Sequence, residues 1–182
     1  MKLFKIFLDT DPVLHEKCKE VETPLSDEIR QTALDMVEYL KASQDDMISQ
    51  KYHIRSGVGI AAPQIGIAKR FFAVYFEDND KVYEYGLINP VILSTSVKKA
   101  YLASGEGCLS VPKDKKGHVY RYFKITIKGF DVVSNKEVTL KLHGYPAIVF
   151  QHEYDHLDGV LYYDRIDKEN PMYDDSEAVC IE

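Results

Sequence analysis

Apolar and polar residues follow a helical period in the first part of the chain. Ser26 stands where a helix N-cap is expected, and Asp27 and Glu28 follow in the first turn, where the helix dipole favours acidic groups. The apolar residues with helical spacing are Ile29, Ala33, Met36, Val37 and Leu40. This pattern predicts an amphipathic helix over residues 27–43, whereas residues 43–57 show no clear period and are expected to form a loop.

Beyond residue 66 the pattern changes to that of β-strands. Residues 70–76 are rich in aromatic side chains, and residues 78–80 form a polar turn. The extended pattern resumes over residues 82–92, where Pro90 is expected to interrupt it because proline cannot donate a hydrogen bond to a sheet.

A second pair of strands shows strict alternation of apolar and polar residues. In residues 123–128 the isoleucines alternate with lysine and threonine, and residues 138–142 alternate in the same way after a polar turn at 134–136. A period of two is typical of half-buried strands, so these residues predict a hairpin.

A second helix is expected at residues 145–157. Gly144 and Pro146 stand at its start and Gly159 just past its end, which is the usual placement of these residue types. Together with the strands, the two helices indicate an α+β fold. We expect mainly antiparallel strands packed around the second helix, with an N-terminal helix and a short extended C-terminal tail. No repeat or linker divides the chain, so residues 1–182 are expected to form a single domain.

Composition narrows the class of protein. The chain has 182 residues, of which 45% are hydrophobic, and this suits a folded core rather than a disordered chain. A formal charge of −6 gives no basic field for a phosphate backbone, which argues against stable nucleic-acid binding. The longest apolar run, residues 71–76, is too short to span a membrane, and no signal peptide is visible. Three widely spaced cysteines fit a reducing compartment, so a cytoplasmic protein without a membrane partner is expected.

The clearest chemistry lies within the second predicted helix, in the residues His152-Glu153-Tyr154-Asp155-His156. His152 and His156 lie one turn apart on the same face, where two imidazoles can bind one metal ion. Glu153 is rotated from His152 by roughly 100°, so it can act on a water molecule as a general base. A chance occurrence of the pattern is the alternative, but the helical context and the flanking caps favour a metal site.

A catalytic metal usually has three protein ligands, so a third ligand is expected elsewhere in the chain. Cys108 is the strongest candidate, because the neighbouring Gly105 and Gly107 allow close backbone approach and a thiolate binds soft metals well. Cys18 lies in a charged stretch and Cys180 in an acidic tail, and both are expected to be ordinary thiols.

The segment GVGIAAPQIG, residues 57–66, superficially matches a dinucleotide-binding fingerprint. We reject this match because polar residues precede the segment and Pro63 obstructs the helix that the fingerprint requires. A tight loop that brings the backbone and the Gln64 amide close to a reacting group suits the segment better. Taken alone, though, it is more simply a structural Gly-rich turn.

Three motifs in this order, GVGIAAPQIG, EGCLS and QHEYDHLDG, resemble the signature motifs of the peptide deformylase family. The N-terminal segment DPVLHEKC and the strand pattern are also similar, so the resemblance covers nearly the whole chain. It implies an α+β fold and an enzyme of N-terminal processing. Such an enzyme hydrolyses the formyl group from the N-terminal formyl-methionine of newly made polypeptides and releases formate.

The resemblance also implies a metal site. Its ligands would be Cys108, His152 and His156, and they would hold one divalent metal. The metal implied in the cell is ferrous iron, Fe²⁺, which Zn²⁺ or Ni²⁺ can replace; the sequence itself does not choose among them.

Further roles follow from the same resemblance. Glu153 would handle the proton, while Gln64 and the backbone N–H of Leu109 would bind the formyl oxygen. Gly59 would lie where the substrate backbone pairs with the enzyme.

Two more pairs of residues are given roles by the family pattern. Ile148 and Val149 would help to line the pocket for the methionine side chain, although plain core packing explains them equally well. Arg121 would pair with Glu106 and so brace the cysteine loop.

The implied partners are formyl-methionyl nascent peptides. The loop before Gly57 is long and the tail over residues 170–182 has no long helical pattern, which resembles the type common in Gram-positive bacteria. In family members with a helical tail, that helix docks on the ribosome. A transient ribosome contact is therefore left open here, and no RNA contact is assigned to any residue.

Two rival functions are weighed against this one. A general metallopeptidase shares the His-Glu-x-x-His helix, but the cysteine ligand and the loop around Gln64 argue against it. A non-catalytic module stabilised by metal would use a fourth protein ligand and need no base, so the presence of Glu153 argues against that function.

Overall fold

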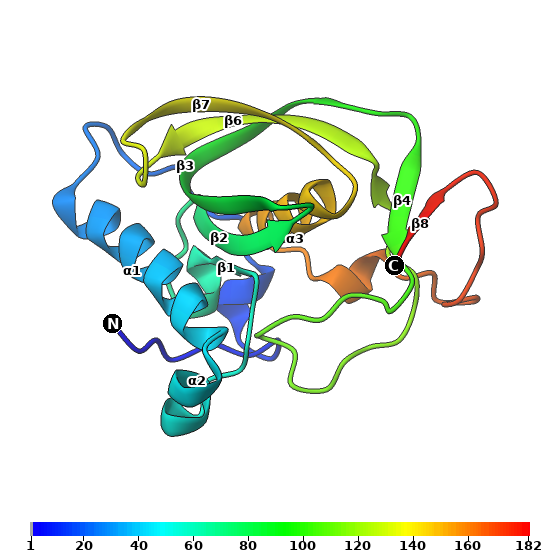
Figure 1. Cartoon of the computed structure of the whole chain (residues 1–182), viewed down its shortest axis with the longest axis horizontal. Helices are drawn as coiled ribbons and strands as arrows, with labels where there is room; N and C mark the ends of the chain where they lie inside the picture. The colour runs from blue at the N-terminus through cyan, green and yellow to red at the C-terminus, as the bar shows by residue number, and fades with distance from the viewer. Residues whose placement is uncertain (1) are drawn as a thin grey trace.

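The structure, a computed structural model, describes residues 2–182 (Figure 1). In this range the chain forms three α-helices, three 3₁₀-helices and eight strands. The helices are α1 (Asp27–Ser43), α2 (Asp46–Tyr52) and α3 (Tyr145–Leu157), with the 3₁₀-helices η1 (Pro12–His15), η2 (Ala62–Ile65) and η3 (Tyr162–Arg165). Strand pairing is mainly antiparallel, so the fold is α+β, as the sequence predicts.

Five strands form the main sheet in the order β1-β2-β3-β6-β7, and every neighbouring pair is antiparallel. They are β1 (Gly59–Ala61), β2 (Phe71–Asp78), β3 (Lys81–Thr95), β6 (Lys124–Asp131) and β7 (Lys136–His143). The predicted hairpin is confirmed as β6–β7. Because β1 is at the edge of this sheet, one side of its backbone pairs with no strand of residues 2–182.

Both faces of the main sheet are covered, as the side chains of β2 show. Phe72 and Val74 belong to the apolar cluster that includes α3, whereas Phe71 and Ala73 belong to the cluster that includes α1. Successive side chains of a strand point to opposite faces, so a strand covered on both sides is apolar throughout. In Figure 1, α3 lies within the curve of the strands and α1 lies outside it.

The two predicted helices are confirmed over their predicted ranges. Ser26 caps α1 by accepting a hydrogen bond from the N–H of Ile29 at 3.3 Å. Gly144 precedes α3 with φ 64°, a conformation that favours glycine. Among residues 2–182, no helix combines the length and the apolar character that a membrane span requires.

The predicted loop over residues 43–57 is wrong in part, because α2 lies inside it. Asp45 caps this helix by accepting from the N–H of Ile48 at 2.9 Å, and His53 ends it with φ 53°. None of the residues of α2 is buried, and Met47 is 83% exposed. The helix therefore has no apolar face that a periodic pattern could reveal, and local capping supports it instead.

Pro90 interrupts the pairing of its strand, as predicted, but it does not end the strand. β3 continues through this residue to Thr95, with an irregular register between Ile88 and Val91. Proline lacks the N–H that a ladder needs, and the irregular register leaves it outside the pairing with β6. The interruption is thus confined to the hydrogen bonds of the ladder.

A smaller sheet has the order β5-β4-β8. Its strands are β4 (Lys99–Leu102), β5 (Arg121–Tyr122) and β8 (Val179–Ile181). The predicted extended tail is confirmed as β8, which lies parallel to β4.

The C-terminal segment holds both ends of the loop over residues 103–120, which joins β4 to β5. At one end the N–H of Ala103 donates to the carbonyl of Ile181 at 2.9 Å. At the other end the N–H of His118 donates to the carbonyl of Pro171 at 2.8 Å. Since this loop carries the EGCLS motif, the tail supports the segment that holds the cysteine.

Replacing Phe72 by alanine should lower the free energy of unfolding by about 3–5 kcal/mol. Its ring is fully buried and packs edge to face on Phe150, with 5.8 Å between the ring centroids, so its loss leaves a cavity between the sheet and α3. Chemical denaturation at a fixed metal content measures the change. Val91→Ala, at a half-exposed position of β3, is the control and should change stability by less than about 0.5 kcal/mol. Equal losses in the two variants would contradict this assignment of the core.

Candidate metal centre

α3 turns two histidines away from the main core. Ala147, Phe150 and Leu157 pack into the apolar cluster of the sheet, and His152 and His156 do not belong to it. Because core packing anchors the opposite side of the helix, the imidazoles are held in defined positions.

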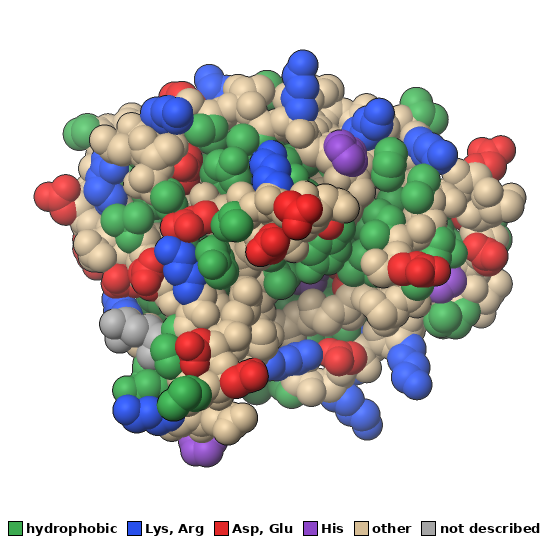
Figure 2. Space-filling model, viewed as in Figure 1, with side chains coloured by type: hydrophobic (Ala, Val, Ile, Leu, Met, Phe, Trp, Pro, Cys, Tyr) green, Lys and Arg blue, Asp and Glu red, His purple; other side chains and the backbone are tan. Residues whose placement is uncertain are grey.

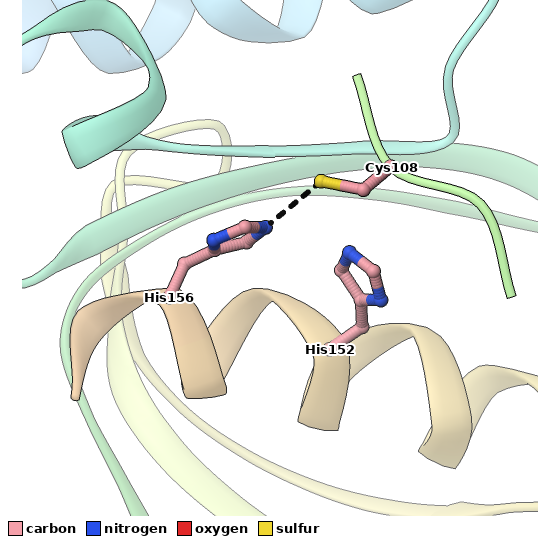
Figure 3. Close-up of side chains that lie close together, drawn as sticks. All are labelled: Cys108, His152 and His156. Carbon is pink, nitrogen blue, oxygen red and sulfur yellow. Dashed lines mark hydrogen bonds between the residues drawn. The ribbon is translucent and has the colours of Figure 1, made fainter. Parts of the chain in front are cut away.

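The loop with the EGCLS motif brings Cys108 to these two histidines (Figure 3). One ligand atom from each of Cys108, His152 and His156 lies within 4.8 Å of the others. Cys108 Sγ is 3.3 Å from His156 Nε2. A thiolate and two imidazoles form a ligand set that suits zinc and iron.

Two buried polar atoms beside this cluster have no hydrogen-bond partner among residues 2–182. They are Glu153 Oε2 and His156 Nδ1. Buried polar atoms are nearly always paired, so such exceptions call for a functional reason. A carboxylate oxygen without a partner, next to three converging donors, fits a catalytic metal site, which has three protein ligands and acts on water.

Glu106 orients one of the histidines. Its Oε2 lies 2.7 Å from His152 Nδ1, so the ring donates through Nδ1 and leaves the lone pair of Nε2 for a metal. Arg121 binds both oxygens of Glu106, through Nε at 2.6 Å and Nη2 at 2.8 Å. The predicted pairing of Arg121 with Glu106 is confirmed, and it is a buried bidentate ion pair.

Asp155 extends this buried network. Its carboxylate accepts from Arg121 Nη1 at 2.8 Å and from Arg165 Nε at 2.5 Å and Nη2 at 2.6 Å. The network thus runs from His152 through Glu106, Arg121 and Asp155 to Arg165. Asp155 and Arg165 were not predicted from the sequence. A buried acid on a helix must be paired, which could have indicated Asp155, whereas no local pattern indicates Arg165.

η2 places Gln64 beside the cysteine. Its Oε1 accepts from the N–H of Ala61 at 2.8 Å, which fixes the amide with Nε2 toward Cys108. Nε2 lies 3.4 Å from Cys108 Sγ and 3.0 Å from Ser110 Oγ. The GVGIAAPQIG segment is a short strand followed by a 3₁₀ turn, and it presents an amide donor to the cluster.

A pocket of about 240 Å³ opens next to the cluster. Figure 2 shows a hollow near the middle of this face of the molecule. The remaining predicted site residues all line this pocket: Gly59, Gln64, Leu109, Ile148, Val149 and Glu153. Ile148 and Val149 are also buried, and Val149 belongs to the apolar core, so the pocket wall and the core share this turn of α3.

Gly59 makes space for Glu153. A Cβ atom built on Gly59 would overlap the Glu153 carboxylate. Only glycine therefore lets β1 pass so close to α3 at this point. The edge strand and the carboxylate meet within the pocket.

Burial and charge shift the pKa values of the two carboxyl groups in opposite directions. Burial raises the pKa of Glu153 to about 7, although the charges of His152 and Arg121 oppose the rise. Burial would also raise the pKa of Glu106, but the charge and hydrogen bonds of Arg121 outweigh it and lower the pKa to about 2. Glu106 therefore stays ionised, while Glu153 can exchange a proton near neutral pH.

The two imidazoles also differ. Burial lowers the pKa of His156 well below its usual value, and the charge of His152 adds to this effect. Burial lowers the pKa of His152 too, but hydrogen bonds to Cys108 and Glu106 outweigh it and raise the pKa well above its usual value. Metal ligands must be deprotonated, so metal binding at this site is expected to release a proton from His152.

Related proteins are found over almost the full length of the chain. The family model described as Polypeptide deformylase matches residues 3–172. Peptide deformylase 2 of Bacillus subtilis (strain 168) is 49% identical over 178 residues, which cover 97% of this chain and 96% of that protein. The peptide deformylase of Staphylococcus epidermidis (strain ATCC 12228 / FDA PCI 1200) is 51% identical over 176 residues, 96% of each chain. Both organisms are Gram-positive, as the sequence type predicts.

Solved structures agree with the fold. The crystal structure of peptide deformylase from Thermotoga maritima has a TM-score of 0.71 and 34% identity, and the match covers 92% of this chain and 99% of that one. Peptide deformylase from Thermus thermophilus has a TM-score of 0.72 and 35% identity, with 93% and 89% covered. Both the sequence relatives and the structural neighbours therefore place the chain in the polypeptide deformylase family.

Proposed function

We propose that this pocket carries out the deformylase reaction, with Cys108, His152 and His156 as metal ligands and Glu153 as the general base. Membership of the family makes the protein a metal-dependent hydrolase that removes the N-terminal formyl group from nascent polypeptides. The assignment of roles is supported above all by the three ligand atoms within 4.8 Å of one another.

When bound at these three residues, a divalent metal supplies Lewis acidity and lowers the pKa of a coordinated water to about 7. Glu153 accepts a proton from the attacking water. Its own pKa of about 7 lets it pass this proton on to the nitrogen of the departing methionine. The products are formate and a free amino terminus.

Two N–H groups are assigned to the negative charge that develops on the formyl oxygen. They are the side-chain amide of Gln64 and the backbone N–H of Leu109, and both residues line the pocket. Gln64 Nε2 carries two N–H groups and lies 3.0 Å from Ser110 Oγ and 3.4 Å from Cys108 Sγ, so one of these contacts has to give way when the formyl oxygen binds.

The substrate is proposed to bind through its backbone and its first side chain. The unpaired edge of β1 at Gly59 offers backbone groups to an extended peptide. Ile148 and Val149 provide an apolar wall for the methionine side chain.

The proposal also covers the metal bound in the cell, the place where the protein acts and its domain organisation. Ferrous iron is proposed as the metal in the cell, as the family resemblance implies, with zinc or nickel as replacements. A thiolate ligand reduces the Lewis acidity of a bound metal, so the rate is expected to depend on which metal is present. Formyl-methionyl nascent peptides are proposed to meet the enzyme in the cytoplasm, as they leave the ribosome. Residues 1–182 are proposed to form one domain, of which residue 1 lies outside the described residues, because all three motifs meet in one pocket.

Formate release from a formyl-Met tripeptide tests the reaction and its base. Glu153→Gln should keep its metal but lower kcat by about 10²–10⁴-fold, because the general base is lost. Glu137→Gln, on the exposed part of β7, is the matched control and should behave as wild type. The role of Glu153 would be refuted by normal turnover of a metal-loaded Glu153→Gln variant. Cleavage of an internal bond in an unformylated peptide would favour a general metallopeptidase.

Chelation should abolish formate release, and anaerobic addition of Fe²⁺ should restore more activity than addition of Zn²⁺. Cys108→Ala should no longer bind one equivalent of metal, since it removes the thiolate ligand. Cys180→Ala, at an exposed thiol, should bind as much metal as wild type. Metal analysis of the purified variants measures this, and full metal content in Cys108→Ala would exclude the proposed ligand set.

Glu106→Gln should weaken metal binding by about 10–100-fold, because groups that orient a ligating histidine contribute about this much. The substitution keeps the shape of the side chain but removes the charge that faces His152 and Arg121. Competition with a fluorescent chelator measures the affinity. An affinity equal to that of Glu137→Gln would show that Glu106 has no such role.

A further inference from the structure

Arg55 links two walls of the pocket. It lies between α2 and β1, and its guanidinium reaches the cysteine loop. Nη1 donates to the carbonyl of Cys108 at 2.9 Å and to that of Val111 at 3.0 Å. Nη2 lies 3.1 Å from Asp114 Oδ1. Arg55 belongs to none of the three motifs, and the proposed reaction gives it no role.

The carbonyl of Cys108 belongs to the same peptide group as the N–H of Leu109. This peptide bond is trans, because Thr23–Pro24 is the one cis bond within residues 2–182. In a trans peptide the C=O and the N–H point in opposite directions. The Cys108 carbonyl accepts from the N–H of Val111 at 3.1 Å as well as from Arg55, so these two donors together fix its direction and with it the direction of the Leu109 N–H.

The N–H of Leu109 is free to act on a ligand. It donates to no backbone acceptor within residues 2–182, and Leu109 lines the pocket. A hydrogen bond from a charged donor to the carbonyl of a peptide group polarises that group and strengthens its N–H as a donor. The bond from Arg55 thus acts on both the direction and the strength of this N–H.

We propose that Arg55 is a positioning residue for deformylation. Through the Cys108 carbonyl it orients and polarises the Leu109 N–H that stabilises the charge on the formyl oxygen. This inference rests on the proposed function, since it needs the Leu109 N–H to act in the reaction.

The two carbonyl bonds, rather than the ion pair, are the basis of this role. The side chains of Arg55 and Asp114 are 46% and 57% exposed, and exposed ion pairs contribute little. The two N–H bonds of Nη1 reach carbonyls three residues apart, which a lysine ammonium does not reproduce with the same planar geometry. Asp114→Asn therefore offers a control that removes the ion pair and leaves both carbonyl bonds.

The kinetic test compares Arg55→Ala, Arg55→Lys and Asp114→Asn as metal-loaded full chains, with formyl-Met tripeptide and rates expressed per bound metal. Arg55→Ala should lower kcat and kcat/KM alike by about 10–100-fold, less than the loss of a whole oxyanion donor, with KM unchanged. Arg55→Lys should recover part of the loss. Asp114→Asn should stay within about twofold of wild type.

A spectroscopic signature separates positioning from a general structural effect. In zinc-loaded, ¹⁵N-labelled protein, Arg55→Ala should displace the amide resonance of Leu109, and Asp114→Asn should leave it in place. Methylguanidinium added to Arg55→Ala should raise kcat in a saturable manner, because the vacated site is partly exposed.

The possible outcomes are distinct. A wild-type kcat in Arg55→Ala, or a lowered kcat with the Leu109 resonance unmoved, overturns the proposal. Should Arg55→Ala fail to bind metal, Arg55→Lys decides: a lowered kcat with a displaced Leu109 resonance supports the proposal, and wild-type values of both overturn it. If wild-type protein releases no formate, the proposed function itself fails, whatever the variants do.

Discussion

An ion pair shielded from solvent, between Arg121 and Glu106, ties β5 to the loop that carries Cys108. Glu106 also binds His152 of α3, so a single carboxylate links the smaller sheet, the cysteine loop and the helix that carries both histidines. Buried charges are stable only when each has partners, and Asp155 and Arg165 complete the set. The positions of His152 and of the loop that carries Cys108 therefore depend on electrostatic contacts that apolar packing alone could not provide.

Apolar packing performs a different task. The main sheet and α3 share one apolar cluster, and this contact sets the position and rotation of the helix. Once α3 is fixed, its other face can carry polar groups whose burial costs stability, such as the unpaired oxygen of Glu153. Gly59 allows the edge strand to approach that carboxylate. One side of α3 thus contributes to stability through apolar packing, and the opposite side carries the polar groups of the candidate site.

The parts of the fold that depend on local physics could be predicted from the sequence. α1 and α3 have caps and apolar periods, and the β6–β7 hairpin has strict alternation. α2 escaped detection because it buries no side chain, and the short strands β4 and β5 because their pairing is set by distant residues.

The candidate site also contains some residues that could be predicted from the sequence and others that could not. Two histidines at helical spacing and a neighbouring acid form a motif that can be recognised in a single segment. The need for a third ligand and the flanking glycines pointed to Cys108, and the family resemblance gave Gln64 its expected role. Arg55 and Arg165 bind partners that lie far away in the sequence or on another element, so the sequence around each gives no indication of them.

The hold of residues 171–181 on both ends of the loop 103–120 has a consequence for biosynthesis. The ribosome makes this segment after α3 and after the loop itself, so the cysteine loop lacks these supports during most of translation. The order of synthesis delays these two contacts with the cysteine loop until the tail has emerged. A partly synthesised copy of this enzyme therefore lacks these contacts, and other chains are processed by copies whose folding is complete.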